Sequence, residues 1–239
     1  MNSEWFNVAI DSFPQLLYAA FFVTLPIALI SFIPSIIVGL SITMIRICFP
    51  GKISFIMHLY VWIFRGTPLL VQLFIIFYGL PHIGIVLDCF SAIVISFTLN
   101  FSAYISEIIR SSILSIPKGQ WDAAYSIGLT RQQTIRHIIL PQIVVISAAP
   151  LSSEFISILK STSLASTVTL PEIFQTAQRI VSTTYQPLII YCEIAIIYLI
   201  LTSFCYIIQM KIESKLKKYT YSMNFYYNKS NKTDLLRKK

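Results

Sequence analysis

Long apolar stretches separated by short polar segments are the dominant pattern of this sequence. The first stretch, Leu16–Ile45, contains no charged residue. At about 1.5 Å per residue, a helix of this length exceeds the roughly 30 Å hydrocarbon core of a bilayer, so we expect a tilted or kinked span. Pro26 and Pro34 are the expected kink sites. Four more apolar stretches follow, at about Ile53–Leu80, Phe90–Ile113, Gln142–Leu164 and Leu188–Met210.

Two interruptions of this pattern have a structure of their own. The tetrapeptide Arg65-Gly66-Thr67-Pro68 lies inside the second apolar stretch and predicts a break in that helix, because proline cannot donate a backbone hydrogen bond. The Ser- and Thr-rich connection Ala165–Pro187 contains apolar residues at helical spacing between Pro171 and Val181. They predict a short amphipathic helix between the fourth and fifth spans.

The polar segment Gly119–Pro141, between the third and fourth apolar stretches, is also strongly patterned. Residues at i, i+3, i+4 and i+7 mark one face of a short helix: Trp121, Ala124, Tyr125 and Gly128. Gly128 then offers a C-terminal stop. Thr130, followed three residues later by Gln133, has the spacing of a capping box that opens a second helix. The segment therefore predicts helix, tight bend, helix.

The composition of the chain predicts a membrane protein. Of its 239 residues 56% are hydrophobic and only 12% charged, and the mean hydropathy is +0.73. Ordinary soluble domains carry about a quarter charged residues, so we expect an all-α, multi-pass protein. The net charge of +8 does not indicate nucleic-acid binding, because half of the lysines and arginines follow Met210 in a short tail. Basic residues beside a span mark the cytoplasmic side and contact anionic membrane lipid.

Five spans place the two termini on opposite sides of the membrane. Basic residues cluster after the first, third and fifth spans, so the positive-inside rule predicts an outside N-terminus and a cytoplasmic C-terminus. We divide the chain into an extracellular segment (residues 1–15), a transmembrane domain (16–218) with a cytoplasmic loop (117–141), and a basic cytoplasmic tail (219–239).

Polar residues recur at helical spacing within three of the spans. The second span carries Arg65 and Gln72; the third carries Ser96, Asn100, Ala103 and Glu107; the fourth carries Ser147, Glu154, Ser157 and Ser161. Such residues line a polar cavity, or they join helix to helix. Arg65 with Glu107 or Glu154 is one candidate structural ion pair. For Asn100 and Glu154, which lie well inside their spans, the functional interpretation is favoured.

No catalytic or metal-binding pattern accompanies these residues. The four cysteines form no C-x-x-C pair and no metal spacing with a histidine, and the chain has no G-x-x-x-x-G-K-[ST] phosphate loop. We therefore expect neither an enzyme nor a metal or cofactor site. A stand-alone secondary transporter is the rival hypothesis, against which stands the absence of an inverted repeat.

The spacing D-A-A-x3-G-x9-I-x-L-P, from Asp122 to Pro141, is similar to the "EAA" loop of ABC importer permeases, with Asp122 where that family usually has Glu. Four other segments resemble the polar amino acid uptake permeases of the histidine, glutamine and cystine type: Phe64–Pro81, Leu99–Trp121, Ser152–Ser166 and Ile190–Thr202. Together they cover nearly the whole chain from about Leu16 to Lys218. The resemblance implies the type I importer fold in a bacterial inner membrane.

The resemblance also implies partners and sites. An ABC ATPase dimer would supply ATP hydrolysis, an extracellular or periplasmic binding protein would deliver an amino acid, and a second permease copy would complete a homodimer. Docking on the ATPase would use Asp122, Ala123, Ala124, Gly128 and Arg131. Substrate would contact Thr67, Leu70, Asn100 and Glu154, together with Gln72 and Ser161 in the same polar stripes.

Two local features of the sequence reduce the set of candidate amino acids that the resemblance allows as cargo. Relatives commonly carry an acid at the position of Ser161, and its absence disfavours a site dedicated to arginine or lysine. The segment Gly79–Asp88 and the pair Leu99-Asn100 look most like the cystine-type members. L-cystine is therefore the first expectation, with glutamine and histidine as alternatives.

Overall fold

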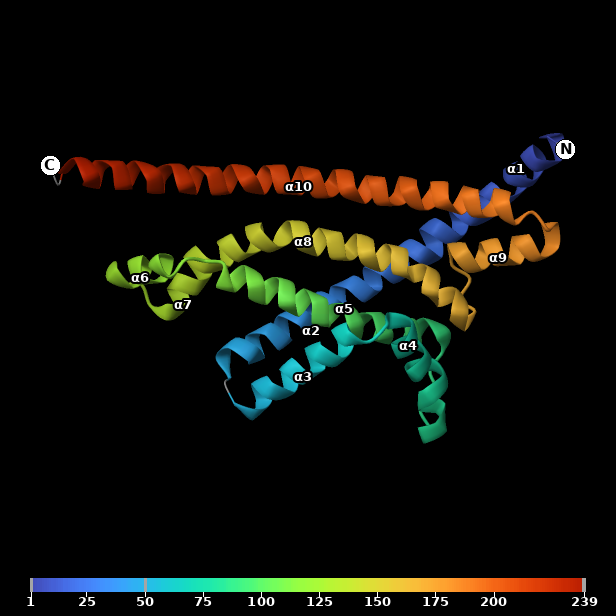
Figure 1. The fold of residues 1–239 in the computed structure, drawn as a ribbon, viewed down its shortest axis with the longest axis horizontal. Helices are drawn as coiled ribbons and strands as arrows, with labels where there is room; N and C mark the ends of the chain where they lie inside the picture. Colours follow the sequence, from blue (N-terminus) through green and yellow to red (C-terminus); the bar gives the residue numbers. More distant parts are fainter. Residues whose placement is uncertain (1, 50, 238–239) are drawn as a thin grey trace. The chain divides into compact units, whose positions relative to one another are not determined.

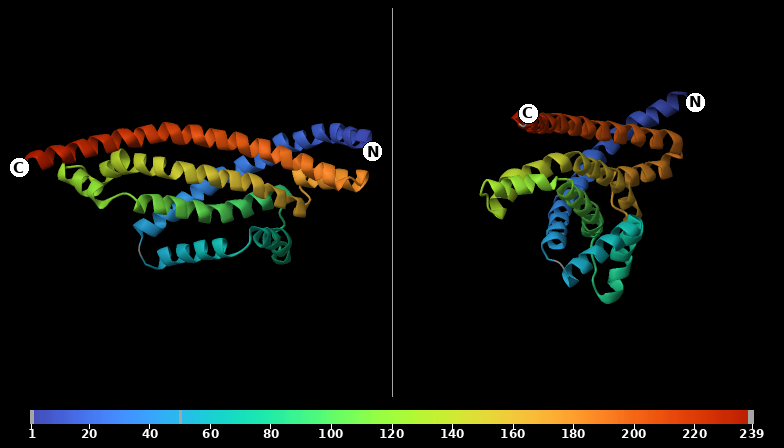
Figure 2. Two further views of the ribbon diagram at one scale, coloured as in Figure 1. Left: turned by 45° about the horizontal axis from the view of Figure 1, so that its top comes forward. Right: turned by 60° about the vertical axis from the view of Figure 1, so that its left-hand side comes forward.

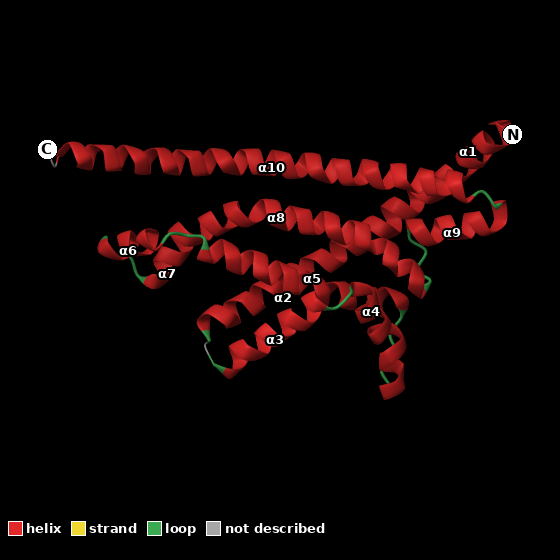
Figure 3. Cartoon of the chain, viewed as in Figure 1, coloured by secondary structure: helices red, strands yellow, loops and turns green. Residues whose placement is uncertain are grey.

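A computed structural model describes residues 2–49 and 51–237, with side-chain burial given for residues 5–49 and 51–216. All regular structure in the described residues is helical (Figure 3), as the sequence predicts. The chain divides into two compact units, which are treated separately below. The first contains Met1–Glu107 and Ser153–Cys205, and the second contains Ile108–Ser152 and Tyr206–Lys239.

The chain begins with one long helix (Figure 1). It consists of α1 (Asn2–Ala19), a π-turn η1 (Ala20–Thr24) and α2 (Leu25–Cys48), and its apolar part, Trp5–Cys48, is 44 residues long. The polar residues near the N-terminus belong to this helix, since α1 covers residues 2–15 of the expected N-terminal segment.

Within the described residues, three π-turns share one relation to proline. They are η1, η2 (Ile75–Gly79) and η4 (Ile135–Ile139), and each ends two residues before a proline: Pro26, Pro81 or Pro141. A proline ring in a helix clashes with the carbonyl four residues earlier, which here is the central residue of each π-turn. The wider turn moves that carbonyl away. Of the two expected kink sites in the first span, Pro26 has such a turn, whereas Pro34 lies inside α2.

The second predicted span is broken where the sequence indicates. Helix α3 (Lys52–Gly66) ends before Thr67, and α4 (Leu69–Phe74) continues through η2 into the 3-10 turn η3 (Leu80–Ile83). The two halves are bent by 105° (Figure 2). The described chain therefore has four helices long and apolar enough to cross a membrane, or five if the bent pair is one span.

The first unit contains a core of apolar side chains from several helices. It includes residues of α1, α2, α5 (Cys89–Leu114), the end of α8 (Leu140–Ser161) and α10 (Pro187–Arg237), among them Leu16, Ile27, Phe97, Ile158 and Ile190. Gly39 permits the close approach of α2 to α5, because a Cβ atom there would lie 2.8 Å from Cγ2 of Ile105 and 2.9 Å from the carbonyl oxygen of Ser102.

The amphipathic helix expected between the fourth and fifth spans is α9 (Ile173–Thr184), which follows the 3-10 turn η5 (Thr162–Val168). Its apolar face packs against α1, and Ile173 and Ala177 are fully buried. The carboxylate of Glu172 caps its first turn by accepting hydrogen bonds from the backbone N–H groups of Phe174 (2.8 Å) and Gln175 (2.7 Å).

The second unit contains α6 (Lys118–Ser126), α7 (Arg131–Thr134) and parts of α5, α8 and α10. Gln209 of α10 donates to the carbonyl of Ala149 in α8 at 3.3 Å. Helix α10 continues past the end expected at Met210, and the side chains of the basic tail, 219–239, lie outside the described residues.

Candidate translocation and coupling sites

The break between α3 and α4 is closed by amide side chains. The Nε2 atom of Gln72 lies within hydrogen-bonding distance of three acceptors: the carbonyl oxygens of Phe64 (3.0 Å) and Thr67 (3.2 Å) and the Thr67 hydroxyl (2.7 Å). Asn100, on α5, donates to the carbonyl of Phe64 and to Oε1 of Gln72, both at 3.1 Å. Three of the six predicted substrate residues therefore converge on one point.

These hydrogen bonds have a clear structural cause. A helix that ends inside a membrane leaves carbonyl groups without helical partners, and lipid cannot satisfy them. Gln72 and Asn100 are only 7% and 4% exposed, and they supply the missing donors. The sequence predicted both the break and the polar residues, but not that the residues hold the break. The orphan carbonyls that precede a Gly-Thr-Pro break are the signal that would have connected the two.

The other three predicted substrate residues, Leu70, Glu154 and Ser161, are half-buried in the same unit. Among the described residues, none of them shares a hydrogen bond with Thr67, Gln72 or Asn100. Glu154, on α8, is close enough to Arg65 for their charges to interact. The geometry thus separates a hydrogen-bonded group from a looser set that includes the only carboxylate of the six.

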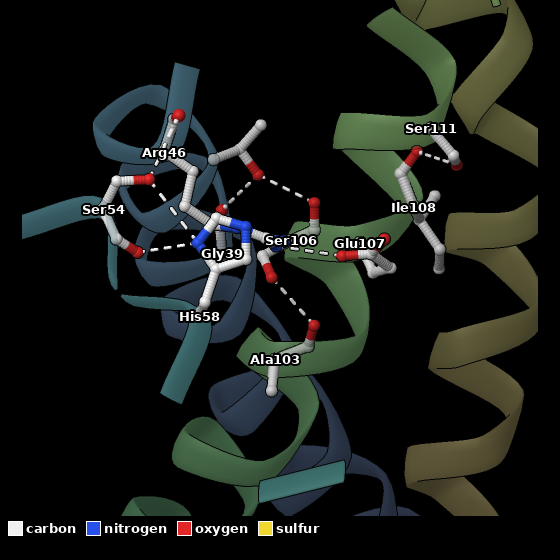
Figure 4. A network of polar contacts seen from close by, with 10 residues as sticks. Gly39, Arg46, Ser54, His58, Ala103, Ser106, Glu107, Ile108 and Ser111 are labelled. Carbon is white, nitrogen blue, oxygen red and sulfur yellow. Dashed lines mark hydrogen bonds and ion pairs between the residues drawn. The ribbon is translucent and has the colours of Figure 1, made fainter. Parts of the chain in front are cut away.

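One of the two candidate ion pairs of Arg65 is wrong. Glu107 pairs instead with Arg46, with 2.9 Å between Nη1 and Oε2 (Figure 4). The close contact of α2 with α5, which Gly39 permits, brings Arg46 at the end of α2 within reach of this carboxylate. Arg65 lies over the ring of Tyr104 with its guanidinium carbon 5.3 Å from the ring centroid.

The serines of the polar stripes bond within their own helices. The hydroxyls of Ser96, Ser147 and Ser157 each donate to the carbonyl four residues earlier, at 2.6, 2.7 and 3.1 Å. Serine and threonine commonly satisfy their hydroxyls in this way. These positions therefore serve the helices that carry them, and the hydrogen bonds do not join helix to helix.

In the second unit, the helix–bend–helix of residues 118–134 has the form that the sequence predicts. Gly128 adopts a φ of 81°, and the backbone N–H groups of Gly128 and Leu129 donate to the carbonyls of Tyr125 and Ala124 at 3.0 and 3.1 Å. Both bonds of the capping box between Thr130 and Gln133 are present. Two local devices, a left-handed glycine and a capped helix start, thus fix the bend.

The five predicted coupling residues differ in exposure. Asp122, Ala123, Gly128 and Arg131 are exposed, whereas Ala124 is 1% exposed. Ala124 therefore packs inside the chain and offers no surface to a partner. The small side chain at this position permits the close packing of the bend itself.

Comparison with known proteins identifies the class. Residues 35–218 match the family of binding-protein-dependent transport system inner membrane components, and the chain belongs to this family. It is the permease subunit of an amino acid ABC importer, a multi-pass protein of the bacterial inner membrane, and such subunits are not themselves catalytic.

Three individual proteins match most of the chain. The chain is 46% identical over 210 residues to the L-cystine transport system permease TcyB of Bacillus subtilis (strain 168), covering 87% of this chain and 90% of the relative. It is 38% identical over 213 residues to YckA of the same organism, which is named as an amino-acid ABC transporter permease; the match covers 89% and 94%. A crystal structure of an amino acid ABC transporter with histidines aligns with a TM-score of 0.82 at 30% identity, over 86% of this chain and 96% of the other.

Proposed function

We propose that this permease carries L-cystine across the inner membrane, driven by a separate ATPase dimer that engages residues 117–141. The 46% identity to TcyB over nearly the full length of both chains is the observation that carries the cargo assignment. Glutamine and histidine are the other candidates, and for histidine the supporting observation is the aligned crystal structure of an amino acid ABC transporter with histidines. A stand-alone secondary transporter is inconsistent with membership of this family.

The cargo would be recognised at the break between α3 and α4. An amino acid carries a carboxylate that accepts hydrogen bonds and an ammonium group that donates them. In our proposal the amides of Gln72 and Asn100, with the hydroxyl of Thr67, exchange part of their bonding to the break for bonding to the cargo. Glu154 provides the negative charge for an ammonium group, and Leu70 and Ser161 complete the contact set.

The coupling surface would consist of Asp122, Ala123, Gly128 and Arg131, with Ala124 supporting it from inside. Helices α7 and α8 are joined through η4 without a break, and the apolar stretch Arg131–Val168 is continuous. In our proposal a displacement at Arg131 would be passed on through these consecutive helical segments, which also carry Glu154 and Ser161. The continuous helical segment supports the proposal that an ATPase on the cytoplasmic side acts on the cargo through it.

The remaining partners follow from the same proposal. Each chain supplies one coupling segment, whereas an ATPase dimer presents two grooves, so a second copy of the permease satisfies the symmetry. Cargo would arrive from a binding protein on the outer side, where the basic-residue bias places the N-terminus.

The test is uptake of labelled L-cystine by cells that express the permease with its ATPase and binding protein. We expect unlabelled cystine to compete most strongly in a panel of amino acids, and Ala123→Arg to abolish uptake because it adds bulk to the exposed coupling surface. The matched control is Thr183→Arg on the exposed side of α9, which should leave uptake unchanged. Undiminished uptake in the Ala123 variant would contradict the coupling proposal, and stronger competition by glutamine or histidine would reassign the cargo.

A further inference from the structure

An open groove of about 510 Å³ lies on the N-terminal side of the break, within the first unit. Helix α3 contributes His58, Trp62 and Arg65, which recur at i, i+4 and i+7 and so share one face. Arg46 of α2 and Glu107 of α5 lie among the other lining residues. Its lining includes Arg65 and Gly66, which directly precede Thr67 of the proposed cargo site in the sequence.

The groove has more basic than acidic groups. Two guanidinium groups line it, and Glu107 is its one acidic side chain. Glu107 pairs with Nη1 of Arg46 (Figure 4), whose side chain is only 6% exposed. Within the part of the chain that the structure describes, Nε of Arg46 is buried and has no hydrogen-bond partner. One carboxylate therefore does not satisfy even the arginine with which it pairs.

Arg65 differs from Arg46 in having no ion-pair partner among the described residues. It is exposed, and no carboxylate of the described residues lies within 4 Å of it; Glu154 acts on its charge from a greater distance. Its guanidinium group rests on the Tyr104 ring, a contact that leaves the N–H donors of its edge available. An arginine within a membrane span faces a partner or a water-filled path, because lipid cannot satisfy its donors.

His58 adds a further polar group to the groove. Its Nδ1 lies 2.7 Å from the carbonyl oxygen of Ser54, which can only accept, so Nδ1 carries a proton and donates (Figure 4). The remaining nitrogen, Nε2, is therefore an acceptor in the neutral ring. Trp62, 73% exposed, provides an apolar wall on the same helix face.

We propose that this groove is the inward section of the transport path and that Arg65, followed by Arg46, binds the carboxylate group of the cargo after it leaves the break. The inference rests on the proposed function and adds a second binding position with defined chemistry. Guanidinium groups bind carboxylates by paired hydrogen bonds, and Nε2 of His58 can accept from the ammonium group of the same amino acid. The phosphate of an inner-leaflet lipid presents similar oxygens, and the experiment separates these two sources.

Trp62 serves as a built-in reporter. In the variant Trp5→Phe/Trp121→Phe it is the only tryptophan of the full chain. With this chain in nanodiscs of neutral lipid, we expect L-cystine to change the Trp62 emission, and cystine dimethyl ester, whose carboxylates are blocked, to bind at least about tenfold more weakly. Inorganic phosphate and nanodiscs with phosphatidylglycerol are the comparison arms. A response to the lipid or to phosphate but none to cystine would overturn the proposal.

The variants locate the binding group. Arg65→Gln should weaken the response to cystine about tenfold, whereas Arg179→Gln, an exposed arginine of α9, should leave it unchanged. Because Arg46→Gln alone removes the ion pair with Glu107, the double variant Arg46→Gln/Glu107→Gln tests Arg46 while keeping the pair neutral. Equal affinity of all these variants would overturn the proposal.

Uptake distinguishes the two levels of the inference. If the complete importer with Arg65→Gln takes up cystine undiminished and Trp62 does not respond to cystine, the groove does not bind the cargo. The proposed function would then still stand. An unaltered complete importer that moves no cystine, while Trp62 still responds to it, would refute the cargo assignment and leave the groove as a carboxylate site.

Discussion

The break between α3 and α4 and the bend between α6 and α7 solve the same problem in opposite ways. Both interrupt a helix next to a glycine and leave backbone groups without helical partners. At the bend, every partner is local: the capping box spans three residues, and the N–H groups that follow α6 bond to carbonyls three to five residues earlier. At the break, Asn100 bonds to a carbonyl 36 residues away in the sequence.

The environment explains the difference. The bend is polar and largely exposed, so water can serve any group that the local bonds leave free. The break lies inside an apolar span, where each unpaired carbonyl is costly and must be satisfied by a buried side chain. The break is therefore tied to α5, whereas the bend depends only on its own residues.

The largest expected effect comes from removing the buried donor at the break. Gln72→Leu keeps the side-chain size but removes the amide that reaches Phe64 and Thr67, so we expect the free energy of unfolding to fall by about 3 kcal/mol and uptake to be lost. Gln132→Leu, at an exposed position of α7, should change the free energy by less than about 0.5 kcal/mol. Thermal unfolding in detergent measures both. Equal losses in the two variants would show that the regions do not differ as described.

The start of α9 combines features of both regions, since its cap is local but buried. Burial raises the pKa of the Glu172 carboxyl to about 7 from its ordinary value of 4.5, against the backbone hydrogen bonds from Phe174 and Gln175, which lower it. The folded state then holds the proton more tightly than the unfolded state. Stability is therefore greatest below about pH 4.5 and falls as the pH rises through 7.

We expect a shift of this size to correspond to about 3 kcal/mol between the two ends of that range. The melting temperature should be higher at pH 5 than at pH 8, and Glu172→Gln should remove most of that difference. Asp88→Asn is the control, because Asp88 is an exposed cap at the start of α5. If the pH dependence of the melting temperature survives in the Glu172 variant and disappears in the Asp88 variant, Asp88 and not Glu172 is its cause, and the prediction is wrong.

The smallest expected effect is at the exposed bend. Thr130→Ala removes both side-chain bonds of the Thr130 hydroxyl and should cost about 1 kcal/mol locally. Hydrogen exchange at residues 131–134 should become faster, while the melting temperature of the whole chain changes little. Ser126→Ala, which removes a hydroxyl bonded within α6, should leave exchange there unchanged. A large drop in melting temperature for Thr130→Ala would mean that the bend is not independent.

This contrast also explains what the sequence could predict. The spans, the amphipathic α9 and the capping box at Thr130 depend on residues within a few positions of one another, and each was predicted from spacing. The pairing of Arg46 with Glu107 and the bonding of Gln72 to Phe64 depend on which helices meet. Local spacing does not indicate that Gly39 permits α2 to pack against α5. Only the structure shows which helix each polar stripe faces.

The π-turns before Pro26, Pro81 and Pro141 each act as an α-helix that has absorbed one additional residue. Because every residue of an α-helix rotates the following side chains by about 100°, a relative without the proline can omit one residue and keep the same faces beyond it. Single-residue gaps in alignments of this family are therefore best placed at these turns. A helical wheel drawn without that correction would assign the residues of α8 to the wrong faces.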